Sequence, residues 1–557
     1  MFTCAVILLL IISNVELRLL VHTEVGSIQG VPADDGDYVM FLGIPYARVN
    51  ASNPFGASLP YPKFNKVFEA NDDSIICPQF IEDDGIYDGT IECLRVNVYV
   101  PNTDNDNKAV FVYIFGGDNK HGHKRKSLYG PKYLVQHGII MVTLNYRLGP
   151  YGFFCTNHPE IAGNQALKDQ YTAIKWVRDN IRAFGGDPQK ITIGGHSSGS
   201  MCVDAHLRTK QPRLFQQAIL QSGTATHPRF IVPPNNTAIL DIADKLGFKT
   251  TDFYKAMSFL AKINPEFIVN ISKSMDWKVC IEKKFEGVFR YISEHPEASE
   301  ANNVHDMNIL GGITSRECIF CIYGDSYKAL MSKSDILEYE LNLKFDFKEN
   351  DKAYERVRRF YYEDANNIEQ NTNATIEFLS DYDFVHPMQR GLVKYSRRRN
   401  TTVFQYLFSY NSDRSIQNRR IMHNVTEKGA AHTEELAYMF YFGEESDKAT
   451  EEELGVMKIF TKLWTNFIKY GNPTPVRTEL LPVSWPPLTA NTVPCLQIDS
   501  NLTVISRPFQ RNVAFWDLFF NIYKKNLRVA FTEKSSANVL SHHIYAFLIS
   551  ILYFCVN

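Results

Sequence analysis

Residues 191–201, ITIGGHSSGSM, join an apolar, β-branched run to a Gly-x-Ser-x-Gly turn and a helix-like continuation. In so tight a strand-to-helix turn, side chains at Gly195 and Gly199 would clash with neighbouring backbone, and the hydroxyl of Ser197 would project into the open. The helix that follows would aim its first N–H groups at the same place, which favours developing negative charge. The segment therefore predicts a nucleophilic serine. A glycine-rich turn with a capping serine is the alternative.

Short apolar runs bounded by turn residues recur along the chain, at 109–115, 138–146, 190–195, 216–223, 307–313 and 402–410. They are hydrophobic throughout rather than alternating, as expected for strands buried on both faces. Residues 164–184 repeat apolar side chains with a helical period and end at a Gly-Gly-Asp-Pro turn. This alternation predicts a single α/β domain with a large, mostly parallel central sheet flanked by helices. The more polar, helix-like stretches 235–300 and 330–400 are expected to elaborate the C-terminal edge of that sheet.

A serine hydroxyl becomes a nucleophile beside a base, and the base needs a carboxylate to orient it. Where a serine stands in such a turn, the acid and the histidine follow it along the chain in that order. Glu317 follows the strand-like run 307–313, and His432 stands in a loop before an apolar helix. With 15 histidines in the chain, position alone does not select His432. His196 adjoins the serine, but neighbouring side chains of the turn point apart, which makes it a poor base.

The charge balance does not favour a nucleic-acid partner. Lys and Arg together number 59 and Asp and Glu 61, which gives a formal net charge of −2. Two basic runs, residues 121–126 and the cluster Arg397-Arg398-Arg399, are interpreted as solvated surface.

The cysteines suggest a disulfide rather than a metal site. Cys77 and Cys93 enclose a loop-like stretch, and in an oxidising compartment they are the expected pair. Cys318 and Cys321 have no second pair at zinc spacing, so no metal site is predicted.

Both ends of the chain carry apolar segments. The run from Ala5 to Ile12 suits the core of a signal peptide at residues 1–20, with a buried N-terminal strand as the alternative. The C-terminal tail, residues 531–557, resembles a GPI-attachment signal, with an amphipathic or partner-docking segment as the alternative. Glycosylation sequons also favour an extracellular protein. They begin at Asn50, Asn235, Asn270, Asn373, Asn400, Asn424 and Asn501.

Ordered segments across nearly the whole chain resemble the type B carboxylesterase and cholinesterase family. They are FLGIPYA (41–47), NYRLGPYGFF (145–154), GNQALKDQ (163–170), NIRAFGGDPQKITIGGHSSG (180–199), QAILQSG (217–223) and NFIKYGNPTP (466–475). The resemblance implies an α/β-hydrolase fold, for which we expect one domain at residues 21–530. It also implies that Ser197, Glu317 and His432 are the catalytic residues, and that Cys77 pairs with Cys93.

Within that family the chain looks more like an insect-type carboxylesterase than a cholinesterase. Family cholinesterases have Glu before the serine, where this chain has His196. Their choline-binding Trp lies in the loop closed by the first disulfide, and no Trp stands between Cys77 and Cys93. A cationic substrate would need such an aromatic face. The family's second disulfide is expected to be missing, because LGFK (246–249) and SFLAK (258–262) lack cysteine.

One segment departs from the family pattern. The family motif for the oxyanion hole is H-G-G-G, but this chain reads IFGGDNKHG, with Phe115 for His and Asp118 for the third Gly. The amides of Gly117, Asp118 and Ser198 would still be the donors. A carboxylate about 4 Å from the oxyanion would oppose it by about 4 kcal/mol at an effective dielectric of about 20. Three interpretations follow: Asp118 slows ester turnover, orients water onto a phosphorylated Ser197, or is tolerated at the pocket rim.

Together these features predict a secreted or lipid-anchored serine carboxylesterase. Its substrates would be neutral or hydrophobic small-molecule esters, cleaved through an acyl-enzyme without a metal or an organic cofactor. One alternative is a cholinesterase-like adhesion or ligand-binding protein with little activity, which Asp118 and the anchor-like tail favour and the full set of catalytic residues opposes. The other alternative is a cholinesterase.

Overall fold

A computed structural model describes residues 19–81, 85–103, 106–322, 336–348, 351–362, 371–414, 425–489 and 491–528. The expected signal peptide, except its last two residues, lies outside this part of the chain. So do the expected C-terminal tail and the sequon at Asn424. Within the described ranges, no helix combines the length and the apolar character that crossing a membrane requires.

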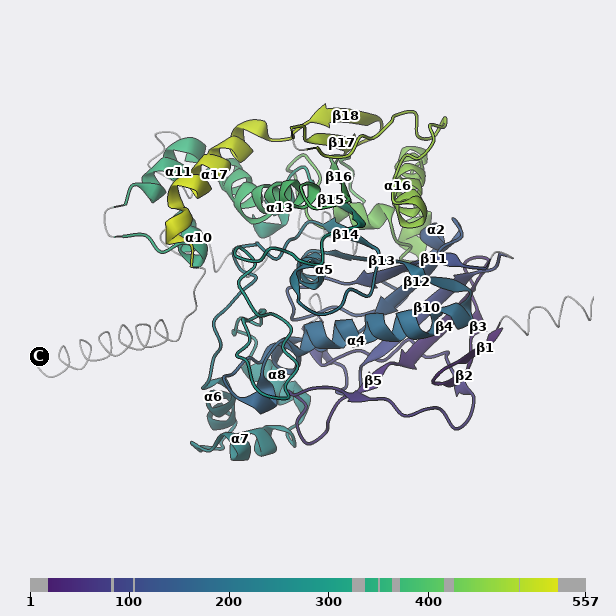
Figure 1. The fold of residues 1–557 in the computed structure, drawn as a ribbon, viewed down its shortest axis with the longest axis vertical. Coiled ribbons are helices and arrows are strands. Elements are labelled where there is room, and N and C mark those ends of the chain that lie inside the picture. The colour runs from purple at the N-terminus through teal and green to yellow at the C-terminus, as the bar shows by residue number, and fades with distance from the viewer. Residues whose placement is uncertain are drawn as a thin grey trace, which may run out of the picture.

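A mixed sheet forms the centre of the molecule (Figure 1), and its strand order over the described residues is β18-β17-β16-β15-β14-β13-β11-β12-β10-β4-β3. Neighbouring strands from β12 to β17 run parallel, and the outer pairs run antiparallel. The parallel strands are β11 (Lys108–Ile114), β12 (Ile140–Leu144), β13 (Gly186–His196), β14 (Gln217–Gln221), β15 (Met307–Thr314), β16 (Thr401–Phe408) and β17 (Pro494–Ile498). The outer strands are β3 (Val31–Pro32), β4 (Tyr38–Pro45), β10 (Arg95–Pro101) and β18 (Leu502–Ser506). Strands β11 to β16 coincide with the apolar runs, so the predicted mostly parallel sheet is confirmed.

Helices flank the sheet, as the sequence predicts. The helical period at 164–184 becomes α4 (Gln165–Asn180) and a 3₁₀ turn (Ile181–Phe184), which ends at Gly185 with φ 80°. The helix after the serine turn is α5 (Ser198–Arg208). In Figure 1, α4 and α5 lie below α13 (His386–Ser396) and α16 (Glu451–Tyr470).

The two polar stretches form small helical groups. In the first group α6 (Ala238–Lys245), α7 (Phe253–Leu260) and α8 (Pro265–Ile271) gather at one end of the molecule. The second group lies at another corner of Figure 1, where α10 (Ile336–Lys344), α11 (Ala353–Tyr362) and, from farther along the chain, α17 (Gln510–Tyr523) gather. Helix α12 (Thr372–Leu379) packs against α11.

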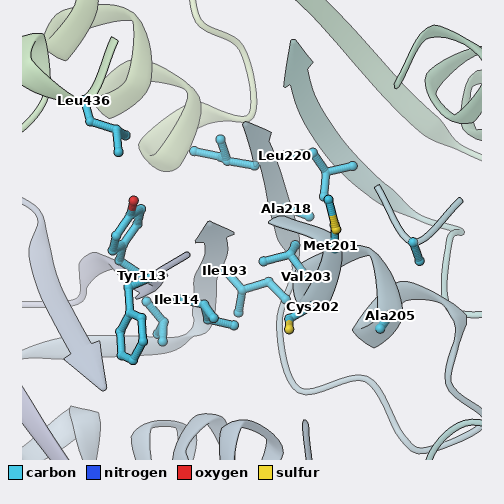
Figure 2. Close-up of a cluster of buried hydrophobic side chains, with 14 of the residues drawn as sticks. Tyr113, Ile114, Ile193, Met201, Cys202, Val203, Ala205, Ala218, Leu220 and Leu436 are labelled. Carbon is cyan, nitrogen blue, oxygen red and sulfur yellow. The ribbon is translucent and has the colours of Figure 1, made fainter. Parts of the chain in front are cut away.

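Apolar packing fixes the helix that follows the serine turn. Figure 2 shows Met201, Cys202 and Val203 of α5 beside Ile193 of β13 and Leu220 of β14. All five side chains are buried. Because large-to-small changes in such a core destabilise a protein by about 2–5 kcal/mol, this layer holds the start of α5 firmly against the sheet.

Disulfides are the part of the fold that the sequence predicts least well. The expected bridge between Cys77 and Cys93 is present, with an S–S distance of 2.00 Å. A second bridge, Cys155–Cys280, spans 125 residues and was not predicted. The segments at 246–249 and 258–262 indeed lack cysteine, but the chain uses other positions. Cys318 also pairs with Cys321.

Candidate active site

The serine turn has the strained geometry that its glycines predict. Ser197, between β13 and α5, has φ 57° and ψ −129°, a region that non-glycine residues avoid unless the surrounding structure imposes it. A Cβ atom at Gly195 would lie 2.7 Å from the backbone of Gly199, and one at Gly199 would lie 2.3 Å from the carbonyl oxygen of Ile114. A side chain at either glycine would therefore clash with the neighbouring backbone, as the sequence predicts. The Ser197 N–H donates to the carbonyl of Gln221 at 2.9 Å.

Glu317 and His432 meet, although 115 residues separate them in the chain. Glu317 begins a 3₁₀ turn just after β15, and its Oε2 lies 2.6 Å from Nδ1 of His432. Oε1 accepts hydrogen bonds from the Ser222 hydroxyl at 2.7 Å and from the Thr314 N–H at 2.8 Å. The backbone N–H of His432 also donates to the carbonyl of Glu317 at 3.1 Å. With Nδ1 facing a carboxylate, the other ring nitrogen of His432 is left to accept a proton.

Ser197 adjoins this pair without a hydrogen bond to it. Its amide is bound to Gln221, the residue before Ser222, and the ring of the preceding residue, His196, lies 4.4 Å from the ring of His432 between centroids. No hydrogen bond joins the Ser197 hydroxyl to His432 in the described part of the chain. Catalytic hydrogen bonds are often long in unliganded enzymes and tighten when substrate binds.

A second buried carboxyl lies behind the pair and was missed from the sequence. An oxygen of Glu435 is 3.7 Å from Nε2 of His196, and both residues are buried. Burial raises the pKa of Glu435 well above its ordinary value, and the charge of Glu317 adds to the increase. Burial therefore favours the uncharged form of Glu435. The only indication of this residue in the sequence is that Glu435 follows His432 by three positions.

The loop after β11 runs past the serine. A Cβ atom at Gly116 would lie 3.0 Å from Cβ of Ser197. Gly117, with φ 122°, has no room for a side chain, because its Cβ would lie 2.1 Å from the carbonyl oxygen of His121. Among described residues, no acceptor binds the amide N–H groups of Gly117, Asp118 and Ser198. These are the three donors predicted for an oxyanion hole.

Asp118 has a partner that the sequence does not reveal. Its carboxylate forms an ion pair with the buried ammonium of Lys278, and Nζ of Lys120 lies 3.8 Å from it. Burial raises the pKa of Asp118, but the charges of Lys278 and Lys120 outweigh that effect and hold it below the ordinary value. The penalty of about 4 kcal/mol that the sequence suggests applies to a carboxylate without a counter-charge. This carboxylate has two ammonium groups beside it.

Lys278 is held in place from two sides. Two residues farther along, Cys280 is bridged to Cys155. On the other side, the Asn119 side chain donates to the carbonyl of Trp277 at 3.0 Å, which ties the lysine segment to the residue after Asp118. Nothing in the local sequence around Lys278 indicates this contact, because the two charges are 160 residues apart.

Aromatic rings cover the open side of His432. Phe320 stacks on its ring at 4.9 Å between centroids, and Phe384 lies at the same distance. Phe320 is 41% exposed, so an apolar surface borders the histidine. Within the described ranges, no group of three or more His, Cys, Asp or Glu side chains could hold a metal ion.

A largely parallel sheet, a strained serine turn at the end of a central strand and a buried carboxylate–histidine pair define an α/β-hydrolase. The chain belongs to the carboxylesterase family, whose family model matches residues 18–516. It is a carboxylic ester hydrolase.

Known proteins similar to this chain come from both branches of the family. Acetylcholinesterase of Bungarus fasciatus is 28% identical over 90% of this chain and 86% of that protein. Esterase B1 of Culex pipiens is 28% identical over 90% of this chain and 98% of that protein. The structure of juvenile hormone esterase from Manduca sexta, with OTFP covalently attached, superposes with a TM-score of 0.74 at 25% identity, over 90% of this chain and 99% of that chain.

Proposed function

We propose that this enzyme hydrolyses neutral or hydrophobic carboxylic esters through an acyl-enzyme on Ser197. The observation that carries the proposal is the 2.6 Å contact between Glu317 and His432 beside the strained serine turn. That contact would fix the histidine tautomer and leave the other ring nitrogen, Nε2, as the base.

In the first half of the reaction, Oγ of Ser197 attacks the ester carbonyl carbon while Nε2 of His432 takes the hydroxyl proton. Glu317 stabilises the imidazolium that forms. The amides of Gly117, Asp118 and Ser198 donate to the tetrahedral oxyanion. Collapse of this intermediate breaks the bond to the alcohol oxygen, which receives the proton from His432 and leaves.

In the second half, a water molecule attacks the acyl-enzyme carbonyl and passes its proton to Nε2 of His432. The second tetrahedral intermediate collapses to the free carboxylic acid, and the proton returns to Oγ of Ser197. Each proton that His432 takes is given back within one turnover. Side chains of this chain therefore suffice for the reaction, and no metal or organic cofactor enters it.

The surroundings of His432 support a neutral or apolar substrate. Phe320 and Phe384 offer apolar surface next to the base. A cationic alcohol would also lack the aromatic face that it needs, because no Trp stands between Cys77 and Cys93. Initial rates with 1-naphthyl acetate and acetylthiocholine test the preference. We expect kcat/KM to be at least about tenfold higher for the naphthyl ester, and the reverse order would support the cholinesterase alternative.

We further propose that the Asp118–Lys278 pair makes the modified oxyanion hole nearly neutral. The carboxylate alone would oppose the oxyanion, and a buried ammonium beside it offsets that charge. On this view, Asp118 slows ester turnover only when its ion pair with Lys278 is lost, and not in the intact enzyme. The interpretation in which Asp118 orients water onto a phosphorylated serine loses support, because the carboxylate is already engaged by Lys278.

The expectation of an extracellular enzyme remains part of this proposal. The sequon residues Asn235, Asn270, Asn373, Asn400 and Asn501 are exposed, which an acceptor needs. Enzymatic removal of N-linked glycans should lower the apparent mass of the secreted protein. Release from intact cells by a phospholipase that cleaves GPI anchors would support the anchor at residues 531–557.

A fluorophosphonate probe tests whether Ser197 is activated. The purified wild type should be labelled and Ser197→Ala should not. Ser500→Ala, a change at an exposed serine in the turn between β17 and β18, is the matched control and should label like the wild type. Wild-type protein that is folded yet unlabelled would overturn the proposal and favour the adhesion or ligand-binding alternative.

A further inference from the structure

A cavity of about 670 Å³ lies along α13 and shares no lining residue with the site described above. Arg390, Val393, Lys394 and Arg397 form one wall. Their spacing of three or four residues puts them on a single face at the C-terminal end of the helix. The remainder of the lining includes Arg507, Thr489, Asn491 and Val493.

The lining is strongly cationic. Its charged residues are the two carboxylates Glu300 and Asp517 and the five cations Arg390, Lys394, Arg397, Arg398 and Arg507. Two of the cations are matched, because Arg398 pairs with Glu300 at 2.5 Å and Arg507 with Asp517 at 2.7 Å. A positive excess of three charges therefore faces the cavity.

The three remaining cations lack full compensation from the protein. Arg390 pairs with Glu297, but that carboxylate also holds Lys344 at 2.7 Å. Lys394 donates to the carbonyl of Ser299 at 2.6 Å, which satisfies a donor without cancelling its charge. The guanidinium of Arg397 has neither an ion pair nor a hydrogen bond with any described residue.

The position of these cations near a helix end does not by itself explain the cluster. A helix C-terminus attracts cations, but that effect accounts for one or two of them and not for a walled group of five.

We propose that this cavity binds a small organic polyanion whose charges are sulfate or phosphate esters on a polar, sugar-sized framework. Guanidinium groups match tetrahedral oxyanions with paired hydrogen bonds. Thr489 and Asn491 in the lining can bond to hydroxyls of the framework. The cavity has the volume of a small-molecule site, and the chain has a net charge of −2, which favours a compact molecule over a nucleic acid. The site is independent of ester hydrolysis.

Isothermal titration of the purified full chain with sucrose octasulfate and with inositol hexakisphosphate tests the proposal. We expect saturable one-to-one binding of at least one probe, and the tighter of the two identifies the charged group. Lys394→Gln/Arg397→Gln should weaken binding at least about tenfold. Ester turnover should stay at the wild-type rate, which shows that the variant is folded.

Arg399→Gln is the matched control. Arg399 has the same charge two residues from Arg397, but it is 71% exposed, pairs with Asp306 and does not line the cavity. We expect its affinity to stay within about twofold of the wild type. Absence of saturable binding with both probes would overturn the proposal. Equal weakening by Arg399→Gln and by the double variant would also overturn it, because it would indicate diffuse surface attraction.

Discussion

The two halves of the active site hold a carboxylate in opposite ways. In the acid–base half, Glu317 is fully buried, and neutral donors, the Ser222 hydroxyl and the Thr314 N–H, bind the oxygen that does not face the histidine. In the oxyanion half, the side chain of Asp118 is 56% exposed, and its charge is matched by the ammonium of Lys278.

The two carboxylates therefore differ in what holds them: secondary structure positions Glu317, whereas a single ion pair matches the charge of Asp118. Glu317 reaches its donors from the turn after β15 and from the neighbouring strand end, so ordinary secondary structure holds it. Asp118 depends on a lysine 160 residues away. Removal of the Glu317 carboxylate should therefore abolish most of the activity. Loss of the ion pair at Asp118 should lower the activity only in part, and a second substitution that removes the unpaired charge should restore it.

The largest effect is expected from Glu317→Gln. The substitution removes the charge that orients His432 and stabilises the imidazolium. We expect kcat for 1-naphthyl acetate to fall by roughly 10⁴-fold, the scale of the equivalent change in other triad enzymes. Steady-state kinetics with a matched thermal melt would measure it. A loss smaller than about tenfold in a folded variant would remove Glu317 from the mechanism.

Breaking the ion pair in the oxyanion half should have an intermediate effect. Lys278→Met leaves the carboxylate of Asp118 without its main counter-charge. The bare-charge penalty of about 4 kcal/mol must be discounted because the side chain is half exposed, so we expect kcat/KM to fall by about tenfold. Adding Asp118→Asn to Lys278→Met removes the stranded charge and should restore kcat/KM to within about threefold of the wild type.

Lys120→Met is the matched control for that pair. Lys120 is also near Asp118, but at 3.8 Å and more exposed than Lys278. We expect less than about a threefold change, because exposed pairs contribute little. A double variant no better than Lys278→Met alone would mean that Lys278 acts by packing and not by charge.

The acid–base half was largely predictable from the sequence. Runs of apolar residues predict strands β11 to β16, because a strand covered on both faces has no polar positions. The glycines at 195 and 199 predict the turn at Ser197, because only glycine fits there. The family resemblance then assigns Glu317 and His432. Sequence pattern works here because each feature is local to one element.

Contacts between distant segments were not predictable in this way. The partner of Asp118 lies in an irregular segment whose only local mark, Cys280, pairs with a residue 125 positions earlier. The cluster at Arg397 was interpreted as solvated surface, and Arg397 and Arg399 are indeed exposed. What the sequence does not show is that Arg397 and Arg507 line the same cavity. Charge pairs and cavities form between elements, and their partners have no fixed spacing in the chain.

The loss of kcat/KM in Lys278→Met should depend on pH. This dependence is smaller than the loss itself, but it tests directly whether the charge of Asp118 is responsible. In the wild type the neighbouring charges hold the pKa of Asp118 below its ordinary value, so Asp118 is ionised across the working range. Lys278 is the main cause of this lowering, so without it the pKa of Asp118 rises. Protonation at acid pH then removes the opposing charge, so kcat/KM of the variant relative to the wild type should rise by about threefold from about pH 8 to about pH 5. A ratio that does not change with pH would contradict the charge argument.

Within the acid–base half, Ser222→Ala should have a far smaller effect than Glu317→Gln. The change removes one of two donors to Oε1 of Glu317 and leaves the Thr314 N–H in place. Ser222 has φ 51°, and alanine keeps the same Cβ, so the change adds no backbone strain of its own. A lost hydrogen bond to a charged group that keeps a second donor should lower kcat by about three- to tenfold, with KM unchanged. A fall as large as that of Glu317→Gln would mean that the carboxylate is held by this one hydroxyl, and the contrast between the two halves of the site would disappear.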